Sequence, residues 1–247
     1  TNTIGLILPD ISDLFYSSFA KEIERKFSEK NYNVIYGNTL SCFDTCMEYL
    51  HIFQKRNVDT IVIVYPDYAM TEAQKKRLNS FFDFSNTPVL WIDHGLLRKE
   101  ESVVSVNQKM GGCLAVKHLI ELGHTRIGCI CGPHDSKISQ ERLKGYKETL
   151  NNAGISYDSQ LVYHGEFDIE SGSRGIEELL KYGITAVFAC NDMMALGVYV
   201  QSRKMNFQIP EQLSVVGFDN VYLTGALEPP LTTIVPVSYT HLRAHET

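Results

Sequence analysis

Strand-like and helix-like segments alternate along almost the whole chain, and this alternation limits the fold more than any other feature. In the first part of the chain, short β-branched and apolar runs occupy 3–9, 33–38, 59–65 and 88–93. The segments between them have helical spacing, with apolar faces made by Tyr16, Phe19, Ala20, Ile23 and Phe27 and by Met47, Tyr49, Leu50 and Phe53. A strand–helix repeat of this kind predicts a mostly parallel sheet flanked by helices, which is an α/β fold.

The pattern stops in a charged link at 94–108 and then starts again. Helices are predicted at 109–122, 141–153, 170–182 and 193–204, and strands at 126–131, 161–165, 186–190 and 213–219. Gly123 and Gly154 fit as the residues that end two of these helices. Two tandem βαβ modules predict two lobes facing each other across a cleft, an N-terminal lobe at 1–103 and a C-terminal lobe at 104–232.

The end of the chain departs from this pattern. Residues 231–235 have strand character, and we expect 233–237 to form a return strand toward the N-terminal lobe. Residues 238–247 lack any apolar period, so we expect them to be a non-native tail.

Composition narrows the functional class. With 44% hydrophobic and 21% charged residues the chain resembles an ordinary globular protein, and its net charge of −6 argues against a nucleic-acid surface on these residues. No apolar run reaches the roughly 18 residues that a membrane span needs, and the N-terminus lacks the features of a signal peptide.

The six cysteines allow three disulfides, a metal site or free thiols. Cys129, Cys131 and Cys190 lie in apolar strand-like runs, where a free cysteine behaves as a small hydrophobic residue. Cys42 and Cys46 flank a helix start without a second ligand pair nearby. We therefore expect reduced cysteines, no bound metal and a cytoplasmic protein.

The common catalytic and nucleotide-binding motifs are absent from the sequence: G-x-x-x-x-G-K-[ST], G-x-G-x-x-G, H-E-x-x-H and G-x-S-x-G. The sequence therefore predicts a protein that is not an enzyme, has no catalytic residues and needs no cofactor.

Polar and aromatic residues recur instead where predicted strands end. Asp10 follows the first strand with Phe15 and Tyr16 just beyond, Phe167 follows the run at 161–165, and Asp219 follows the run at 213–219. Ligands of open α/β sheets bind beyond the carboxyl ends of the strands. These residues are therefore candidates for ligand contacts.

Each candidate also has a purely structural interpretation. At the end of the strand 186–190 we expect Asp192 to cap the following helix and Asn191 to contact a ligand. Phe15 is either a surface aromatic or helix-start staple, or a ring that faces the cleft. Arg142 is expected near the start of its helix, where a cation opposes the helix dipole, so it either pairs with Glu141 or points its guanidinium into the cleft.

Aromatic rings together with aspartate, asparagine and arginine side chains match a polyhydroxylated ligand. Sugar hydroxyls both donate and accept hydrogen bonds, and a ring covers the apolar face of a sugar.

The chain also resembles a known family. The segments that carry the resemblance, in chain order, are IGLILPDISDLFYSSFAKEIE, ELGHTRIGCICGP, ERLKGYKETL, AVFACNDMMALGV, IPEQLSVVGFDN and PPLTTIVP. Together they resemble the lactose/galactose-repressor family of bacterial transcription regulators over nearly all of 3–236. The resemblance implies a type I periplasmic-binding-protein-like core of two lobes joined by crossing strands.

The resemblance implies an effector site as well. Its residues would be Phe15, Tyr16, Arg142, Phe167, Asn191 and Asp219, with Asp10 and Asp93 as lesser members. Asp13 and Leu14 stand where the family often has Asn-Pro, and the segment HDSKISQE lacks the extra arginine and threonine of purine-responsive members. This favours a sugar or sugar-like effector.

The resemblance finally implies how the protein works. We expect the effector-sensing core of a dimeric regulator that controls operator DNA through a helix-turn-helix domain preceding the core and absent from this chain. The alternatives are a solute-binding protein of a sugar transporter and an enzyme on a flavodoxin-like scaffold, which no motif supports.

Overall fold

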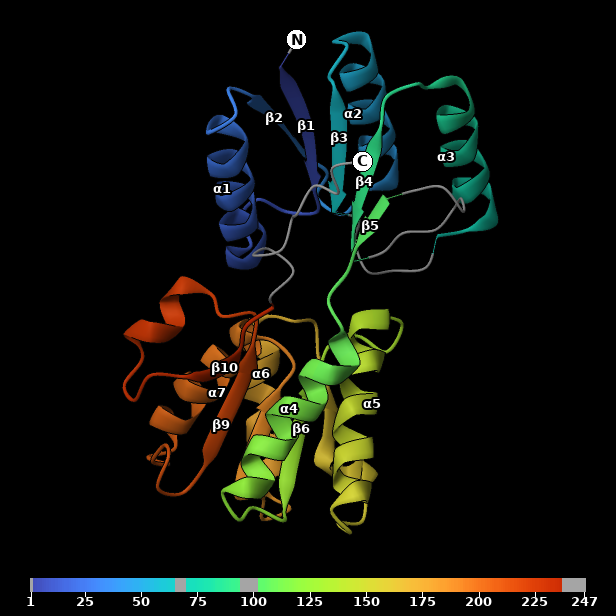
Figure 1. The fold of residues 1–247 in the computed structure, drawn as a ribbon. Helices are drawn as coiled ribbons and strands as arrows, with labels where there is room; N and C mark the ends of the chain where they lie inside the picture. The colour runs from blue at the N-terminus through green and yellow to red at the C-terminus, as the bar shows by residue number, and fades with distance from the viewer. Residues whose placement is uncertain (1, 65–69, 94–101, 237–247) are drawn as a thin grey trace. The chain divides into compact units, whose positions relative to one another are not determined.

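The computed structural model describes residues 2–64, 70–93 and 102–236. They fall into two compact units, one within 2–106 and the other at Asn107–Pro236. Each unit contains one five-stranded parallel sheet with helices packed against it (Figure 1). The predicted fold class, two α/β lobes with parallel sheets, is confirmed.

The first unit has the strand order β2-β1-β3-β4-β5. Its elements are β1 (Thr3–Leu8), α1 (Leu14–Ser28), β2 (Asn33–Asn38), α2 (Phe43–Lys55), β3 (Thr60–Val64), α3 (Glu72–Phe84), β4 (Val89–Ile92) and β5 (Ser102–Val104). Alternate residues of the central strands supply two cores. On β3, Ile61 and Ile63 pack with α2 and α3, whereas Val62 and Val64 pack with α1. Burial on both faces explains why these strands are apolar without interruption.

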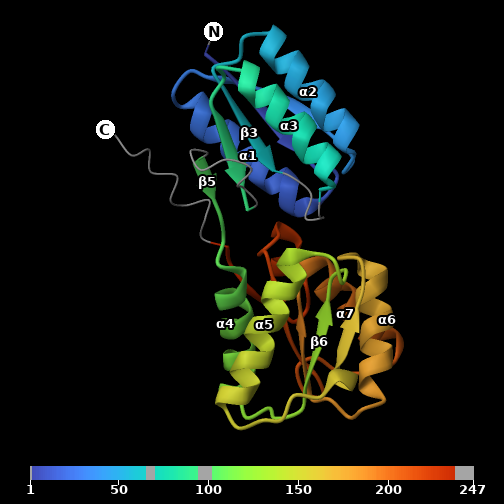
Figure 2. The ribbon, with the colours of Figure 1, turned by 90° about the vertical axis from the view of Figure 1, so that its right-hand side faces the viewer.

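The second unit has the strand order β10-β9-β8-β6-β7. Its elements are α4 (Gln108–Glu121), β6 (Ile127–Cys131), α5 (Lys137–Asn152), η1 (Ser159–Leu161), β7 (Val162–His164), α6 (Ile169–Leu180), β8 (Ala186–Ala189), α7 (Asp192–Lys204), β9 (Ser214–Phe218), η2 (Tyr222–Ala226) and β10 (Thr232–Ile234). Helices α4 and α5 lie on one side of this sheet and α6 and α7 on the other (Figure 2). Gly123 and Gly154 follow the ends of α4 and α5 with φ of 93° and 72°, as predicted for helix terminators.

The two units share one topology. In both, the first strand of the unit lies between the second and the third, and the fourth and fifth extend the sheet on the far side. The direction of winding reverses beside that first strand, so each sheet has a switch point between β1 and β3 or between β6 and β8.

Two elements differ from the sequence-based prediction. Helix α3 was not predicted, although Thr71 and Gln74 form a capping box and Leu78, Phe81 and Phe82 give it a buried face. Strand β5 lies inside the predicted link at 94–108, because a three-residue strand in a charged stretch carries no periodicity. It pairs with β4 and so extends the first unit to residue 106, beyond the predicted limit at 103.

The last described residues belong to the second unit. Thr233 and Ile234 are part of β10, which pairs with β9, and the unit extends to Pro236. The expected return of 233–237 toward the N-terminal lobe stays a prediction. Residues 94–101 of the link and the predicted tail at 238–247 lie outside the described residues. Within the described residues, none of the helices combines the length and the apolar composition that crossing a bilayer requires.

Candidate functional site

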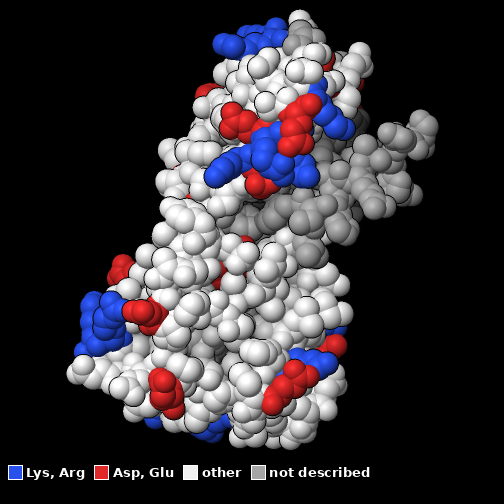
Figure 3. Space-filling model, turned by 60° about the vertical axis from the view of Figure 1, so that its left-hand side comes forward, with Lys and Arg blue, Asp and Glu red and all other residues white. Residues whose placement is uncertain are grey.

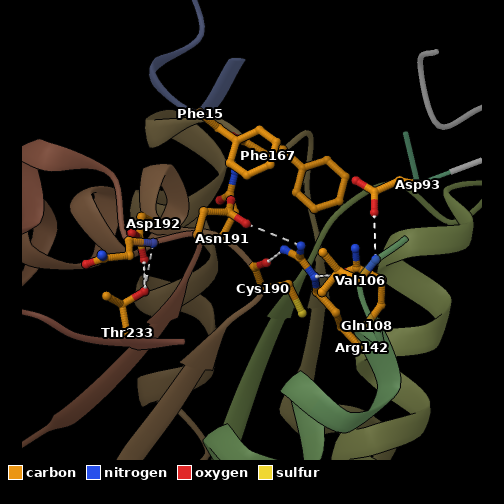
Figure 4. Close-up of polar contacts among 12 residues, drawn as sticks. Phe15, Asp93, Val106, Gln108, Arg142, Phe167, Cys190, Asn191, Asp192 and Thr233 are labelled. Atoms are coloured by element: carbon orange, nitrogen blue, oxygen red, sulfur yellow. Dashed lines mark hydrogen bonds and ion pairs between the residues drawn. The ribbon is translucent and has the colours of Figure 1, made fainter. Parts of the chain in front are cut away.

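The guanidinium of Arg142 lies beyond the carboxyl ends of β8 and β9, where it contacts Cys190 and Asp219. Its Nε donates to Oε1 of Gln108 at 2.8 Å, its Nη1 donates to the carbonyl of Cys190, and its Nη2 lies 3.3 Å from Oδ1 of Asp219 (Figure 4). The ring of Phe218 covers the guanidinium, with 3.5 Å between Cζ and the ring centroid. Arg142 is only 4% exposed, so these contacts hold the cation in one orientation.

Arg142 sits deeper in its helix than predicted. Helix α5 begins at Lys137, because the hydroxyl of Ser136 accepts from the amide of Ser139 at 2.9 Å. The polar segment before residue 141 has no apolar period, so the sequence pattern hid this start. The predicted conflict with the helix dipole is therefore wrong, and so is the pairing with Glu141, which binds Lys144 at 2.5 Å.

Asp219 follows β9 and faces Arg142. Its backbone adopts φ of 106°, which is rare for a residue other than glycine, while its amide donates to the carbonyl of Ile234 at 2.9 Å. Phe167 and Asp93 also have positive φ, at 62° and 63°. Strained backbone of this kind persists only where the surrounding structure fixes it, and it often marks functional sites.

Asn191 and Phe167 contact each other at the same edge of the sheet. The Nδ2 of Asn191 donates to the carbonyl of Phe167 at 2.9 Å, and its Oδ1 accepts from the amide of Met194 at 2.9 Å. The ring of Phe167 packs on Gly132, where an added Cβ would lie 2.1 Å from Cζ of the ring. Asn191 therefore fixes the loop that carries the ring.

The capping residue of α7 is Asn191 rather than Asp192, which corrects the prediction. Helix α7 begins at Asp192, one residue earlier than expected, so the residue before it takes the cap. The fully buried carboxylate of Asp192 instead accepts from the amide of Val221 at 2.9 Å and from the hydroxyl of Thr233 at 2.6 Å. Burial outweighs these hydrogen bonds and the nearby Arg142, and it raises the pKa of Asp192 to about 6.

In the first unit, the loop after β1 holds several predicted residues. Oδ1 of Asp10 accepts from both the amide and the hydroxyl of Ser12, at 2.9 and 2.8 Å. Asp13 caps α1 by accepting from the amide of Phe15 at 2.7 Å. The rings of Phe15 and Tyr16 meet edge to face, with 5.3 Å between centroids. Burial raises the pKa of Asp13, more than its hydrogen bonds to this loop lower it.

Asp93 follows β4, at the same carboxyl edge of the first sheet. Its amide donates to the carbonyl of Val104 at 2.8 Å, and its Oδ1 accepts from the amide of Val106 at 3.1 Å (Figure 4). Asp93 therefore ties β4 to the segment that follows β5.

The predicted residues meet in pairs, while Asp10 contacts Ser12 and Asp93 contacts Val106. Arg142 contacts Asp219, and Asn191 contacts Phe167; Phe15 contacts Tyr16. The prediction omitted Gln108 and Phe218, which orient the guanidinium of Arg142. Gln108 carried no sequence signal, and Phe218 looked like the last apolar residue of a strand.

Basic and acidic side chains are mixed on one face of the molecule. On the face shown in Figure 3, basic and acidic side chains lie in small mixed groups between wide uncharged areas. Such a surface lacks the basic stripe that binds nucleic acid on that face, in line with the net charge of −6.

Comparisons with known proteins point to one class. Residues 116–238 match the family described as "Periplasmic binding protein-like domain". The chain is 32% identical over 236 residues to the HTH-type transcriptional repressor PurR of Vibrio atlanticus, which covers 95% of this chain and 69% of that protein. It is 30% identical over 236 residues to the ribose operon repressor of Escherichia coli K12, covering 95% and 70%. The relatives are repressors, which supports the prediction that the chain is not an enzyme.

A solved structure of a transcription regulator is also similar to this chain. The complex of transcriptional regulator CelR with cellobiose superposes with a TM-score of 0.82 at 28% identity, covering 97% of this chain and 74% of that one.

Proposed function

The chain belongs to the LacI family of bacterial transcription regulators, and we propose that it senses a sugar or sugar-like effector in the cleft predicted between its two lobes. Binding there would change the affinity of an attached helix-turn-helix domain for operator DNA. The relatives are repressors, which favours a regulator over the solute-binding protein of a transporter.

The geometry of Arg142 is the observation that carries this proposal. Each of its three guanidinium nitrogens donates one hydrogen bond within the described residues, so both terminal nitrogens keep a second N–H for a ligand. The amide of Asn191 likewise has one N–H without a partner among the described residues. Asp219 adds a carboxylate beside the guanidinium. A sugar hydroxyl can accept from the cation and donate to the carboxylate at once.

Aromatic rings supply the other half of the chemistry. Phe167 in the second unit and the Phe15–Tyr16 pair in the first could cover the apolar faces of a sugar ring. The structure of CelR contains cellobiose, which supports a carbohydrate for this chain.

Effector binding can control DNA binding through thermodynamic linkage between the two sites. A ligand that prefers one arrangement of the lobes shifts the population of the arrangement that fits the operator. We further propose that the regulator is a homodimer and works in the cytoplasm, where its operator is. Sedimentation equilibrium of the purified chain checks the homodimer.

A thermal-shift screen of the 247-residue chain tests the ligand class. The panel contains pentoses, hexoses, disaccharides including cellobiose, and purine bases. At a ligand concentration one hundred times Kd, mass action stabilises the protein by about 2.7 kcal/mol, which is readily detected as a higher Tm. We expect one sugar to raise the Tm of the parent and to fail with Arg142→Ala.

Arg174→Ala is the matched control, because Arg174 is exposed on α6 and its ion pair with Glu170 spans 3.8 Å. This control should respond like the parent. The proposal fails if no sugar shifts the Tm, if only purines do, or if Arg142→Ala keeps the full shift.

A chimera tests the coupling. The helix-turn-helix domain of the ribose operon repressor is fused ahead of this chain, and binding to the ribose operator is followed by fluorescence anisotropy. The effector found in the screen should change the operator affinity, and an unchanged affinity would contradict the regulatory part of the proposal.

A further inference from the structure

Three cysteines gather under the candidate effector site. The Sγ atoms of Cys129 and Cys131 lie 3.4 Å apart, and that of Cys190 lies 3.9 and 3.8 Å from them. Cys129 and Cys131 share one face of β6, and the amide of Cys190 donates to the carbonyl of Ile130 on that strand. All three are fully buried and free of disulfides.

The spacing of the sulfurs suits a metal ion. The point in the plane of the three sulfurs that is equidistant from them lies about 2.1 Å from each, close to the metal–sulfur distance of about 2.3 Å in zinc thiolate sites. An ion could therefore enter the plane of the three sulfurs without a rearrangement of the strands.

We propose that Cys129, Cys131 and Cys190 bind one Cu(I) ion in three-coordinate geometry. Three soft sulfur ligands select a soft cation. Zn(II) takes a fourth ligand, either a protein group or water. Within the described residues these three cysteines form a metal-ligand group without a fourth member, and their full burial leaves no access for water.

A histidine on the neighbouring strand β7 already has other contacts. His164 lies opposite Cys131 in the pairing of β7 with β6. Its Nδ1 lies 3.1 Å from the carbonyl of Gly132, and its ring stacks on His134 with 3.6 Å between centroids. These contacts orient His164 toward Gly132.

The positive charge of Arg142 stabilises the metal-bound form of the three cysteines. Binding releases the three thiol protons to water and leaves three thiolates around a monovalent cation, a net charge of two negatives. The guanidinium of Arg142 donates to the carbonyl of Cys190 and offsets part of that charge.

An anaerobic titration tests the proposal. The reduced chain is titrated with Cu(I) against a competing Cu(I) chelator, and bound copper is measured by metal analysis and by thiolate-to-copper absorption in the ultraviolet. A variant with Cys42→Ser, Cys46→Ala and Cys113→Ser keeps only the proposed ligands. We expect it to bind one Cu(I) per chain, as the parent does at this site, and to gain thermal stability.

The contrary variant is Cys131→Ser, which keeps the size of the side chain and removes one sulfur ligand. It should lose stoichiometric binding and the absorption band while keeping the circular dichroism of the parent. If Cys131→Ser does not fold, Cys129→Ala replaces it. The variant that retains only the three cysteines tests Cu(I) binding independently of either substitution. The proposal is wrong if that folded variant binds no Cu(I), if Cys131→Ser binds as the parent does, or if Zn(II) displaces the copper.

Discussion

At the scale of single residues, the structure assigns different tasks to neighbours that look alike in the sequence. Asn191 caps α7 and positions Phe167, whereas Asp192 is buried and joins the segment after β9 to β10. Two adjacent polar residues at a strand end both fit a capping role in sequence, and only the start of the helix separates them. The prediction that Asp192 caps α7 is wrong, and the prediction that Asn191 contacts a ligand stays a prediction.

Asp192 should make stability depend on pH. Its pKa of about 6 in the folded state exceeds the 3.8 of an ordinary aspartate, so between about pH 4 and pH 6 the folded protein keeps a proton that the unfolded chain has released. The free energy of unfolding therefore falls as pH rises through this window, by up to about 3 kcal/mol, and the effect ends above it.

Asp192→Asn should lose this pH dependence of the free energy of unfolding, measured by guanidinium denaturation at pH 4 to 7. Thr233→Val should extend the window to higher pH, because it removes a hydrogen bond that favours the carboxylate. The same pH dependence in the parent and in Asp192→Asn would contradict this assignment.

At the scale of elements, glycines allow helices to approach through their backbones. An added Cβ at Gly145 of α5 would lie 2.2 Å from the carbonyl oxygen of Lys109, and at Gly112 of α4 it would lie 2.3 Å from that of Arg142. Gly172 and Gly197 make a similar seam between α6 and α7. The helical periods predicted these four helices, but nothing local to the sequence indicated which helix pairs with which.

Replacing Gly145 with alanine tests the first seam. Alanine favours an isolated helix by about 1 kcal/mol, yet the clash with backbone of α4 should give a net loss of about 1–3 kcal/mol in the free energy of unfolding. Because α5 carries Arg142, effector affinity should fall too. Gly225→Ala is the control, since a Cβ there meets no atom within 4 Å. Equal denaturation midpoints for the two variants would show that the seam does not limit stability.

At the scale of the whole molecule, two units of identical topology each place polar and aromatic side chains at the carboxyl edge of their sheet. If both contribute to one effector site, Phe15→Ala in the first unit should weaken the effector about tenfold, which is about 1.4 kcal/mol. Arg142→Ala in the second should weaken it about a hundredfold. Calorimetric titration measures both, with Phe84→Ala as the control because Phe84 is 88% exposed. If the effector draws the two units together, small-angle X-ray scattering should show a smaller radius of gyration with the effector than without it. An unchanged affinity in Phe15→Ala would confine the site to the second unit.

The sequence by itself determined the two α/β units, most of their helices and strands, and the family. These features depend on neighbours two to four residues apart, which the periodicity records directly. It also located the candidate residues at strand ends, because the end of an apolar run is visible locally.

Tertiary structure alone decided that Arg142 is held by Gln108, Cys190 and Asp219, and that three cysteines from β6 and the end of β8 converge. Cys129 and Cys190 are 61 residues apart and Arg142 and Asp219 are 77 apart. Contacts over such separations depend on the order of strands in the sheet, and no local pattern encodes that order.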